Sequence, residues 1–310
     1  MMAAEFKVLL AEGLDGDTER RLDSGARIVR APAKADEDTL CHLIADCDAL
    51  VARTHTRVTR RLLAAGRRLR VVGVAGVGLE RVDVAAAEEL GVAVLHTPAA
   101  ASDAVAEFAV ALMLQLLRPI PRLSKAYAAG DFRAARGRPH GRELRELTVG
   151  IVGMGRIGSR VGRICRAGCG ARVLYSDIVE VGPFDFDASR VDKPTLWSES
   201  DIVTLHVPAT ELTHHLVDAD VLTDMRASAF LINTARGVVV ETVALVDALR
   251  RGSIAAAALD VVEPEPLPPE HPLFGLDNCV LTPHVAARTH GGLRRMYAVA
   301  DDVLAFLAGS

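Results

Sequence analysis

The sequence has few aromatic residues and few cysteines. Aromatic side chains make up 4% of its 310 residues, and its five cysteines are scattered along the chain. Cys165 and Cys169 lie four residues apart without a second ligand pair to complete a zinc site, and His214-His215 also lacks a partner at zinc-ligand spacing. We therefore expect no metal site. We expect buried free thiols in a reducing compartment, the cytoplasm, at Cys41, Cys47, Cys165, Cys169 and Cys279.

Strong net charge and long apolar segments are lacking as well. The formal net charge is -4, which provides no basic surface for nucleic acid. The N-terminus has no cationic stretch followed by an apolar core, so no secretory signal is predicted. The longest apolar run, Ala104–Leu117, carries Glu107 and Gln115 and is shorter than the ~20 residues that cross a bilayer. We expect a cytoplasmic protein that binds neither nucleic acid nor a membrane.

Half of the residues are hydrophobic, and they form short β-rich runs that alternate with helical stretches. This alternation indicates parallel sheets covered by helices on both faces. The fold class predicted is α/β, with two doubly wound parallel-sheet domains. The first series of predicted strands is Phe6–Leu10, Ala26–Arg30, Ala49–Arg53, Arg70–Val74 and Ala93–His96. The second series is Val149–Gly153, Arg172–Ser176, Ile202–His206, Ala229–Asn233, Ala255–Asp260 and Cys279–Thr282.

The two series of strands define two domains. A helix from Ser102 to Arg118, closed by Pro119 and Pro121, is expected to connect them. A last helix, Gly292–Leu307, has no sheet left to build, so we expect it to pack back on the first domain. We therefore place a discontinuous first domain at residues 1–97 and 286–310, and a second domain at residues 98–285.

A glycine-rich turn follows the first strand of the second domain. Gly153, Gly155 and Gly158 have the spacing Gly-x-Gly-x-x-Gly, and a helical stretch comes next. In a dinucleotide-binding loop, the first glycine permits a tight turn, the second lets the backbone approach a pyrophosphate, and the third lets the helix pack closely. The helix N-terminus then favours the phosphates through free amides and the helix dipole. A glycine turn without a ligand is the alternative when such a motif stands alone.

An acidic residue after the next strand indicates which dinucleotide is bound. Asp177 stands 19 residues after Gly158, directly after the predicted strand Arg172–Ser176. A carboxylate there accepts hydrogen bonds from the ribose hydroxyls and repels a 2′-phosphate. Residues 178–180 bring no cation. The sequence therefore favours NAD (NADH) over NADP.

Three polar residues stand after later strands, namely Arg236, Glu265 and His284. Because the carboxyl ends of parallel strands meet at one edge of a sheet, these side chains can converge. A guanidinium binds the carboxylate and carbonyl of a 2-oxo acid through paired donors. Hydride transfer to that carbonyl leaves an alkoxide, which an imidazole can protonate while a carboxylate orients the ring. Each residue alone has an ordinary structural explanation, but the ordered set predicts a hydride-transferring oxidoreductase.

The ordered motifs resemble those of the D-isomer-specific 2-hydroxyacid dehydrogenase family, including its phosphoglycerate dehydrogenases and hydroxypyruvate/glyoxylate reductases. The resemblance implies Arg236 as substrate anchor, His284 as acid/base and Glu265 as its partner. It also implies a Rossmann NAD domain inserted into a flavodoxin-like substrate domain, and a homodimer formed through the NAD domain. The motifs that carry it are Gly76–Gly78, Thr97-Pro98, Gly153–Gly158, Leu205–Pro208, Asn233–Gly237, Leu259–Pro266 and Thr282–His284. The further cofactor-binding residues implied are Arg156, Ile157, His206, Pro208, Thr234, Ala235 and Asp260, and the further substrate-binding residues are Arg53, Gly76, Val77 and Gly78.

The resemblance leaves the substrate open. 3-Phosphoglycerate, glycerate/hydroxypyruvate and glyoxylate are the acids we consider, in either direction of reaction. If Arg53, His55, Arg81 or Arg288 converge, a second anionic group such as phosphate could be bound. Two alternatives use the same scaffold: an NAD-sensing corepressor-like binding protein, which keeps the catalytic residues, and a formate or phosphite dehydrogenase, against which Glu265 argues.

Overall fold

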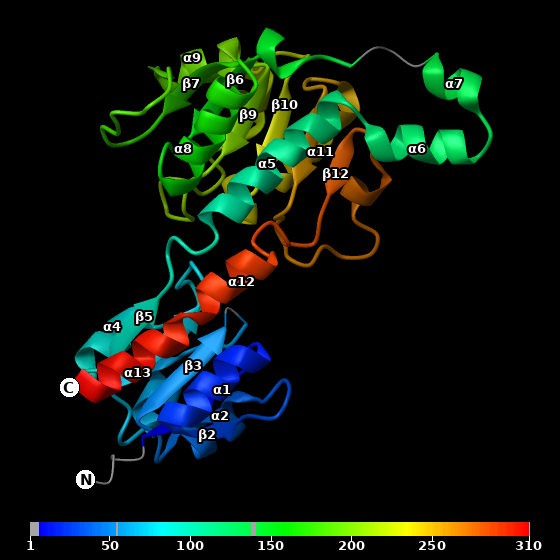
Figure 1. Cartoon of the computed structure of the whole chain (residues 1–310). Helices are drawn as coiled ribbons and strands as arrows, with labels where there is room; N and C mark the ends of the chain where they lie inside the picture. The colour runs from blue at the N-terminus through cyan, green and yellow to red at the C-terminus, as the bar shows by residue number, and fades with distance from the viewer. Residues whose placement is uncertain (1–5, 54, 138–140, 310) are drawn as a thin grey trace. The chain divides into compact units, whose positions relative to one another are not determined.

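The computed structural model describes residues 6–53, 55–137 and 141–309. These residues divide into two compact units, which are described separately (Figure 1). Unit 1 comprises Met1–Ala101 and Arg288–Ser310, and unit 2 comprises Ser102–Ala287.

Unit 1 is built on a five-stranded parallel sheet in the order β2-β1-β3-β4-β5. Side chains alternate across it, so that Leu9 packs with one core cluster while Val8 and Leu10 pack with another, and both faces are buried. The strands are β1 Lys7–Leu10, β2 Arg27–Arg30, β3 Ala49–Arg53, β4 Val71–Ala75 and β5 Ala93–His96. The helices are α1 Gly16–Gly25, α2 Glu37–Ile44, α3 Arg60–Ala65, α4 Val84–Glu89, α12 His290–Tyr297 and α13 Val299–Gly309.

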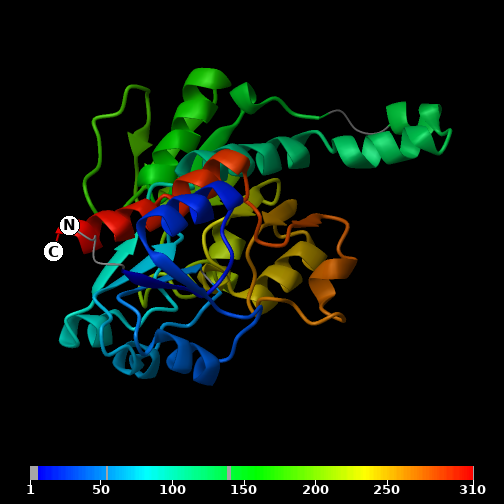
Figure 2. The same cartoon turned by 60° about the horizontal axis from the view of Figure 1, so that its bottom comes forward.

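The C-terminal segment completes unit 1. Helix α13 packs on β4 and β5 and lies beside α1 (Figure 2), and its residues Val303 and Leu307 belong to the core. The predicted packing of the last helix on the first sheet is therefore confirmed. The single helix predicted at Gly292–Leu307 is wrong in one detail, because Ala298 ends α12 and separates it from α13.

Unit 2 contains a seven-stranded parallel sheet in the order β12-β11-β10-β9-β6-β7-β8. The order reverses between β9 and β6, and in such sheets ligands bind at the carboxyl ends of the strands beside this point. The strands are β6 Thr148–Val152, β7 Arg172–Ser176, β8 Ser189–Arg190, β9 Ile202–Leu205, β10 Phe230–Asn233, β11 Ala256–Leu259 and β12 Cys279–Leu281. The α-helices are α5 Ser102–Leu117, α6 Ile120–Ala128, α7 Phe132–Arg136, α8 Arg156–Arg163, α9 Lys193–Glu199, α10 Ala219–Asp224 and α11 Thr242–Arg251. The shorter helical segments are the 3₁₀ helices η1 Leu144–Glu146, η3 Gly237–Val239 and η4 Pro272–Gly275, and the π-helix η2 Ile164–Gly168.

Helix α5 covers the sheet of unit 2 instead of serving only as a connector. It packs against α8, β10 and β11, and Ala109 and Met113 are fully buried in the core. The edge strand β8 was not predicted, because its two exposed polar residues carry no hydrophobic pattern. No single helix among the described residues is long and apolar enough to cross a membrane; α5 and α6 meet the length and composition test only as a pair bent by 54°.

The five cysteines are free thiols in the structure. Cys47 and Cys165 are buried, and the other three are partly buried. Burial raises the pKa of the Cys165 and Cys279 thiols to about 12, so both remain protonated and unreactive near neutral pH.

Candidate active site

The glycine turn of unit 2 has the geometry of a dinucleotide-binding loop between β6 and α8. Gly153 adopts φ +89°, and a Cβ added there would lie 2.6 Å from the carbonyl oxygen of His206. A Cβ at Gly158 would lie 2.1 Å from the carbonyl oxygen of Gly153. A Cβ at Gly155, in contrast, would meet nothing within 4 Å. Gly153 and Gly158 are thus required by the protein's own packing, whereas Gly155 leaves open space at the start of α8, where a pyrophosphate would approach.

Alanine substitutions at Gly158 and Gly155 are therefore expected to have different effects. Gly158→Ala is expected to lower the free energy of unfolding by about 2 kcal/mol, because its Cβ overlaps the Gly153 carbonyl. Gly155→Ala is expected to leave stability unchanged and to weaken NADH binding about tenfold, because its Cβ occupies space that only a ligand would fill. Urea unfolding and NADH fluorescence titration of both variants test this; equal losses of stability would contradict it.

Asp177 follows β7 and lies beside the glycine loop. Its Oδ2 accepts a hydrogen bond from the Met154 amide at 2.7 Å, and its Oδ1 accepts one from the Val179 amide at 3.2 Å. Arg190 of β8 donates from Nη2 to the Asp177 carbonyl oxygen at 3.0 Å. Asp177 therefore lies beside the glycine loop at the carboxyl end of β7, where dinucleotide-binding domains carry the acid that binds the ribose. The unpredicted strand β8 brings a cation next to it.

Two buried polar atoms at the carboxyl edge of the same sheet have no hydrogen-bond partner among the described residues. They are Nδ1 of His206, which follows β9, and Oγ1 of Thr234, which follows β10. Burial lowers the pKa of His206 to about 3, so its imidazole stays neutral, and its Nε2 lies 3.0 Å from Oγ1 of Thr204. Buried polar atoms of this kind usually have a partner. A bound dinucleotide could supply it, so these residues fit the cofactor implied by the glycine turn.

The remaining expected cofactor contacts surround these positions. Arg156 is exposed at the first turn of α8, and Ile157 next to it is half-buried. Pro208 is exposed, and its carbonyl oxygen accepts a hydrogen bond from Oγ1 of Thr213 at 2.6 Å. Ala235 is buried directly after Thr234. All of them lie on segments that follow β6, β9 or β10, at the carboxyl edge of the sheet.

A buried asparagine holds the turn that carries Arg236. Asn233 is fully buried at the end of β10 and donates from Nδ2 to the Arg236 carbonyl oxygen at 2.9 Å. Its Oδ1 accepts the Ala235 amide at 3.0 Å. A Cβ at Gly237 would lie 2.0 Å from the Val262 carbonyl oxygen, so only glycine lets this turn pack on the segment after β11. Arg236 itself is half-buried and donates from Nη1 to the Ala235 carbonyl oxygen at 2.8 Å.

His284 lies in a turn after β12 that the buried carboxylate of Asp260 organises. Oδ1 of Asp260 accepts hydrogen bonds from Oγ1 of Thr282 at 2.6 Å and from the Val285 amide at 2.9 Å, and Oδ2 accepts the Ala286 amide at 2.9 Å. His284 has φ +53°, a left-handed conformation that is costly for a residue with a Cβ. The carboxylate of Asp260 offsets this cost by binding the amides of the two residues that follow.

His284 and Glu265 form the predicted pair. Nδ1 of His284 lies 2.8 Å from Oε1 of Glu265, and their side chains are 51% and 44% exposed. Because Nδ1 is occupied by the carboxylate, Nε2 is left for a reacting group. The pair and Arg236 follow neighbouring strands at the same edge of the sheet, since β11 lies between β10 and β12.

Replacing Asp260 with asparagine tests its role in holding this turn. Asp260→Asn places amide protons against the donors of the turn, and we expect the free energy of unfolding to fall by about 2 kcal/mol. The control is Asp247→Asn, an exposed residue of α11 paired with Arg251, for which we expect a change below about 0.5 kcal/mol. Urea unfolding measures both, and equal values for the two variants would show that the carboxylate does not organise the turn.

The expected substrate residues of unit 1 also lie at the carboxyl edge of a parallel sheet. Arg53 ends β3, with its guanidinium carbon 5.7 Å from the ring centroid of Tyr297 and its Nε 4.0 Å from Oε2 of Glu12. Gly76, Val77 and Gly78 follow β4; the Gly76 amide donates to the Val74 carbonyl oxygen at 2.8 Å, and the Val77 carbonyl oxygen lies 3.0 Å from Nδ1 of His96.

A groove of about 420 Å³ lies beside Arg53 within unit 1. His290, Arg294 and Tyr297 of α12 help to line it. Sequence reasoning missed these three residues, because nothing in the sequence links α12 to β3. Of the residues proposed to bind a second anionic group, Arg53 lines this groove, and Arg81 donates from Nη1 to the His55 carbonyl oxygen at 3.3 Å.

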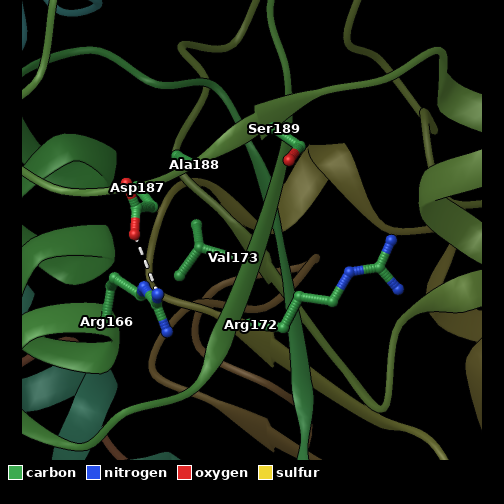
Figure 3. Close-up of a pocket in the computed structure, with 6 residues that line it drawn as sticks. All are labelled: Arg166, Arg172, Val173, Asp187, Ala188 and Ser189. Atoms are coloured by element: carbon green, nitrogen blue, oxygen red, sulfur yellow. Dashed lines mark hydrogen bonds and ion pairs between the residues drawn. The ribbon is translucent and has the colours of Figure 1, made fainter.

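A second, smaller pocket in unit 2 has no catalytic groups (Figure 3). Its arginines are already paired: Arg166 with Asp187 at 2.8 Å, and Arg172 with Glu199 at 3.0 Å. Arg172 begins β7, so the pocket lies at the amino end of that strand, away from the edge that carries the glycine loop.

The sheet of unit 2 carries a dinucleotide loop at its switch point, and an imidazole–carboxylate pair and an arginine lie at the same edge. This arrangement is that of a nicotinamide-dependent dehydrogenase. The chain belongs to the D-isomer specific 2-hydroxyacid dehydrogenase family, since the sequence profile of that family's NAD binding domain matches residues 110–286. It is therefore an NAD-dependent oxidoreductase that transfers a hydride between nicotinamide and a 2-hydroxy/2-oxo acid.

Individual relatives agree with this family. A glyoxylate reductase from Thermofilum pendens is 40% identical, over 88% of this chain and 82% of its own. A D-3-phosphoglycerate dehydrogenase from Archaeoglobus fulgidus is 33% identical over 98% of this chain, which spans only 58% of that longer protein. The crystal structure of the TT0316 protein from Thermus thermophilus superimposes with a TM-score of 0.89 at 34% identity, covering 98% of this chain and 97% of that one.

These comparisons confirm the family, the fold class and the reaction class predicted from the sequence. They favour the hydroxyacid reaction over the corepressor-like and the formate or phosphite alternatives.

Proposed function

We propose that this chain interconverts a small D-2-hydroxy acid and its 2-oxo acid through Arg236, His284 and Glu265, with glyoxylate, hydroxypyruvate/glycerate and 3-phosphoglycerate as the candidate acids. The observation that carries this assignment is the 2.8 Å contact between Nδ1 of His284 and Oε1 of Glu265 at the carboxyl edge of the NAD-binding sheet. It leaves Nε2 to exchange a proton with the substrate oxygen.

The roles follow from the chemistry of each group. The bound nicotinamide supplies or accepts the hydride. The Arg236 guanidinium binds the substrate carboxylate and polarises the carbonyl through paired donors. His284 gives a proton to the oxygen as it becomes a hydroxyl, and takes it back in the reverse direction. Glu265 holds the imidazole ring in one orientation. The resemblance to the family gives Arg53, Gly76, Val77 and Gly78 of unit 1 as further candidate substrate-binding residues.

The choice between NADH and NADPH rests on Asp177. Its carboxylate beside the glycine loop supports NADH, because it would repel a 2′-phosphate. We expect Asp177→Ser to raise the catalytic efficiency with NADPH about tenfold or more relative to NADH, since the repulsion disappears while Arg190 remains nearby. Steady-state kinetics with both cofactors measure this ratio. An unchanged ratio in Asp177→Ser would show that this carboxylate does not select the cofactor.

The assembly proposed is a homodimer formed through unit 2. Helices α6 and α7 extend away from the sheet (Figure 1), and α6 buries none of its residues within the chain. Their surface exposes large apolar side chains, with Ile120 66%, Tyr127 63% and Phe132 55% exposed. Such a patch on two helices suits a second copy of the chain. The free thiols support the proposed cytoplasmic location.

Light scattering after gel filtration tests the dimer. Ile120→Asp is expected to shift the mass to that of a monomer. Val243→Asp, at an apolar position of α11 that is 73% exposed, should leave the dimer intact. A monomeric parent protein, or an unchanged dimer in Ile120→Asp, would contradict the assignment of this surface.

The reaction is tested by following NADH absorbance with a panel of oxo acids: glyoxylate, hydroxypyruvate, phosphohydroxypyruvate, pyruvate and phenylpyruvate. Turnover with one of the first three identifies the substrate class. Turnover confined to pyruvate or phenylpyruvate would show that the substrate is one of these two acids and not one of the proposed acids. If NADH binds and no acid is reduced, the proposal fails.

A further inference from the structure

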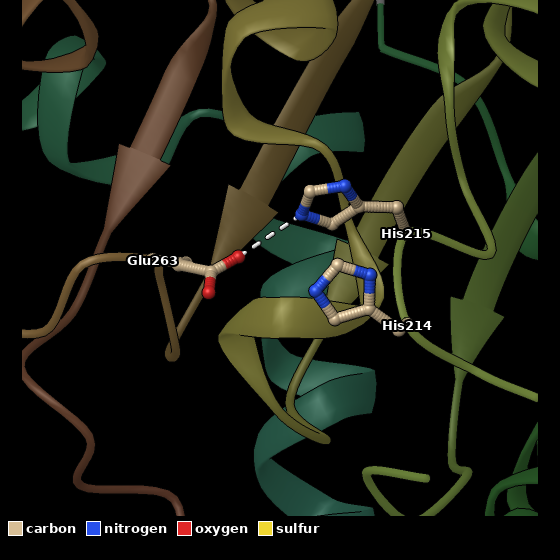
Figure 4. Close-up of side chains that lie close together, drawn as sticks. All are labelled: His214, His215 and Glu263. Carbon is tan, nitrogen blue, oxygen red and sulfur yellow. Dashed lines mark hydrogen bonds and ion pairs between the residues drawn. The ribbon is translucent and has the colours of Figure 1, made fainter. Parts of the chain in front are cut away.

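Two histidines and a glutamate meet on unit 2, outside the groups assigned to catalysis (Figure 4). His214 and His215 lie between β9 and α10, and Glu263 follows β11. One donor atom from each of the three side chains lies within 4.8 Å of the other two. Glu263 follows His215 by 48 residues, so the cluster exists only in the folded chain, and the sequence spacing that predicted no metal site did not reveal it.

The distances suit a single metal ion. Nε2 of His215 and Oε2 of Glu263 are 3.1 Å apart. Two ligands on a tetrahedral Zn²⁺ ion with bonds of ~2.1 Å are separated by ~3.4 Å, so this pair already has nearly the required spacing. The donor atom of the exposed His214 ring lies within 4.8 Å of both, so a rotation of that ring can bring it to the same ion.

The backbone holds the two imidazoles on one side of the chain. His215 adopts φ +48°, a conformation that is costly for a residue with a Cβ. Its amide donates to the Val238 carbonyl oxygen at 2.8 Å, which fixes the turn. The two rings are stacked, with centroids 4.0 Å apart and planes inclined by 30°. Adjacent histidines ordinarily point apart in extended chain, and this strained turn instead presents both to Glu263.

The third ligand is also anchored. The Glu263 carbonyl oxygen accepts a hydrogen bond from Oγ1 of Thr242 at 2.8 Å. The side chains of His215 and Glu263 are 37% and 38% exposed, and His214 is exposed, so an ion can enter from solvent and keep water in its remaining position. Two imidazoles and one carboxylate form a donor set that suits Zn²⁺, Ni²⁺ or Cu²⁺ better than Mg²⁺ or Ca²⁺.

We propose that His214, His215 and Glu263 form a binding site for one divalent transition-metal ion of the zinc class. The site shares no residue with the His284–Glu265 pair. It adjoins the catalytic turn, however, because Val238, which accepts the His215 amide, lies in η3 directly after Arg236 and Gly237. An ion held here would join the loops that follow β9 and β11 on either side of that turn.

The experiment uses the full chain without a histidine tag, after treatment with EDTA. Zn²⁺ affinity is measured by competition with a chromophoric chelator, and Co²⁺ is added separately because its visible absorption reports tetrahedral coordination. The variants are His214→Ala and Glu263→Gln. The matched control is His42→Ala, an exposed histidine of α2 in unit 1. A second control, His284→Ala, shows whether the ion binds the catalytic pair instead.

We expect one Zn²⁺ per chain, a tetrahedral Co²⁺ spectrum, and a loss of affinity of about tenfold or more in His214→Ala and Glu263→Gln. Circular dichroism should show both variants folded, since His214 is exposed and Glu263→Gln keeps the side-chain volume. Unchanged affinity in both variants, an octahedral Co²⁺ spectrum, or a loss confined to His42→Ala or His284→Ala would overturn the proposal. These readouts do not depend on turnover, so they are independent of the proposed substrate.

Discussion

Replacing His284 with alanine is expected to lower kcat by about 10³-fold while leaving the affinity for NADH within about twofold. The imidazole is held by the Glu265 carboxylate at 2.8 Å and by a turn whose amides bind Asp260. Without it, the oxygen that receives negative charge during hydride transfer has no positioned proton donor. The ring is about half exposed and contributes little to the core, so the fold should be unaffected.

Glu265→Gln is the matched variant for this prediction. The amide keeps the volume of the carboxylate and one acceptor for the ring, so we expect a smaller loss in kcat, of about 10-fold to 100-fold. Stopped-flow measurement of NADH oxidation, with NADH fluorescence for binding, separates chemistry from cofactor affinity. A His284→Ala enzyme with kcat near that of the parent would exclude this residue as the acid/base.

Replacing Arg236 with alanine is the second change with a large expected effect. We expect kcat/KM for the oxo acid to fall by about 10³-fold, equivalent to ~4 kcal/mol, because the paired donors for carboxylate and carbonyl are lost. Asn233 and Gly237 hold the turn through backbone contacts, so the position of the backbone should not depend on the arginine side chain.

Arg236→Lys distinguishes charge from geometry. Lysine keeps the positive charge but concentrates it on one ammonium group, whereas arginine offers a planar pair of donors. We therefore expect kcat/KM of Arg236→Lys to be about a tenth of that of the parent enzyme. Initial rates over a range of substrate concentrations, for the parent and both variants, supply kcat and KM. Full activity in Arg236→Lys would show that charge alone suffices, and full activity in Arg236→Ala would remove this residue from the site.

Strand positions and the glycine loop were accessible from the sequence because both depend on local patterns. The eleven strands predicted from hydrophobic runs coincide with β1–β7 and β9–β12 to within one residue at every end. The motif from Gly153 to Gly158 follows a strand and opens a helix, as its spacing predicts. Strand β8 was not predicted, because two polar residues at a sheet edge show no hydrophobic periodicity. The break at Ala298 was not predicted either, because the helical pattern of the sequence continues through it.

What the sequence by itself determined is therefore the strand–helix alternation and the dinucleotide loop, because each is encoded in residues close together along the chain. Only the tertiary structure decided how these residues are held. Asp260 reaches the His284 turn across 25 or 26 residues, Arg190 reaches Asp177 across 13, and Glu263 reaches His215 across 48. Such contacts depend on which strands are neighbours in the sheet, and that order arises only when the helices pack on both faces and bury the strands together.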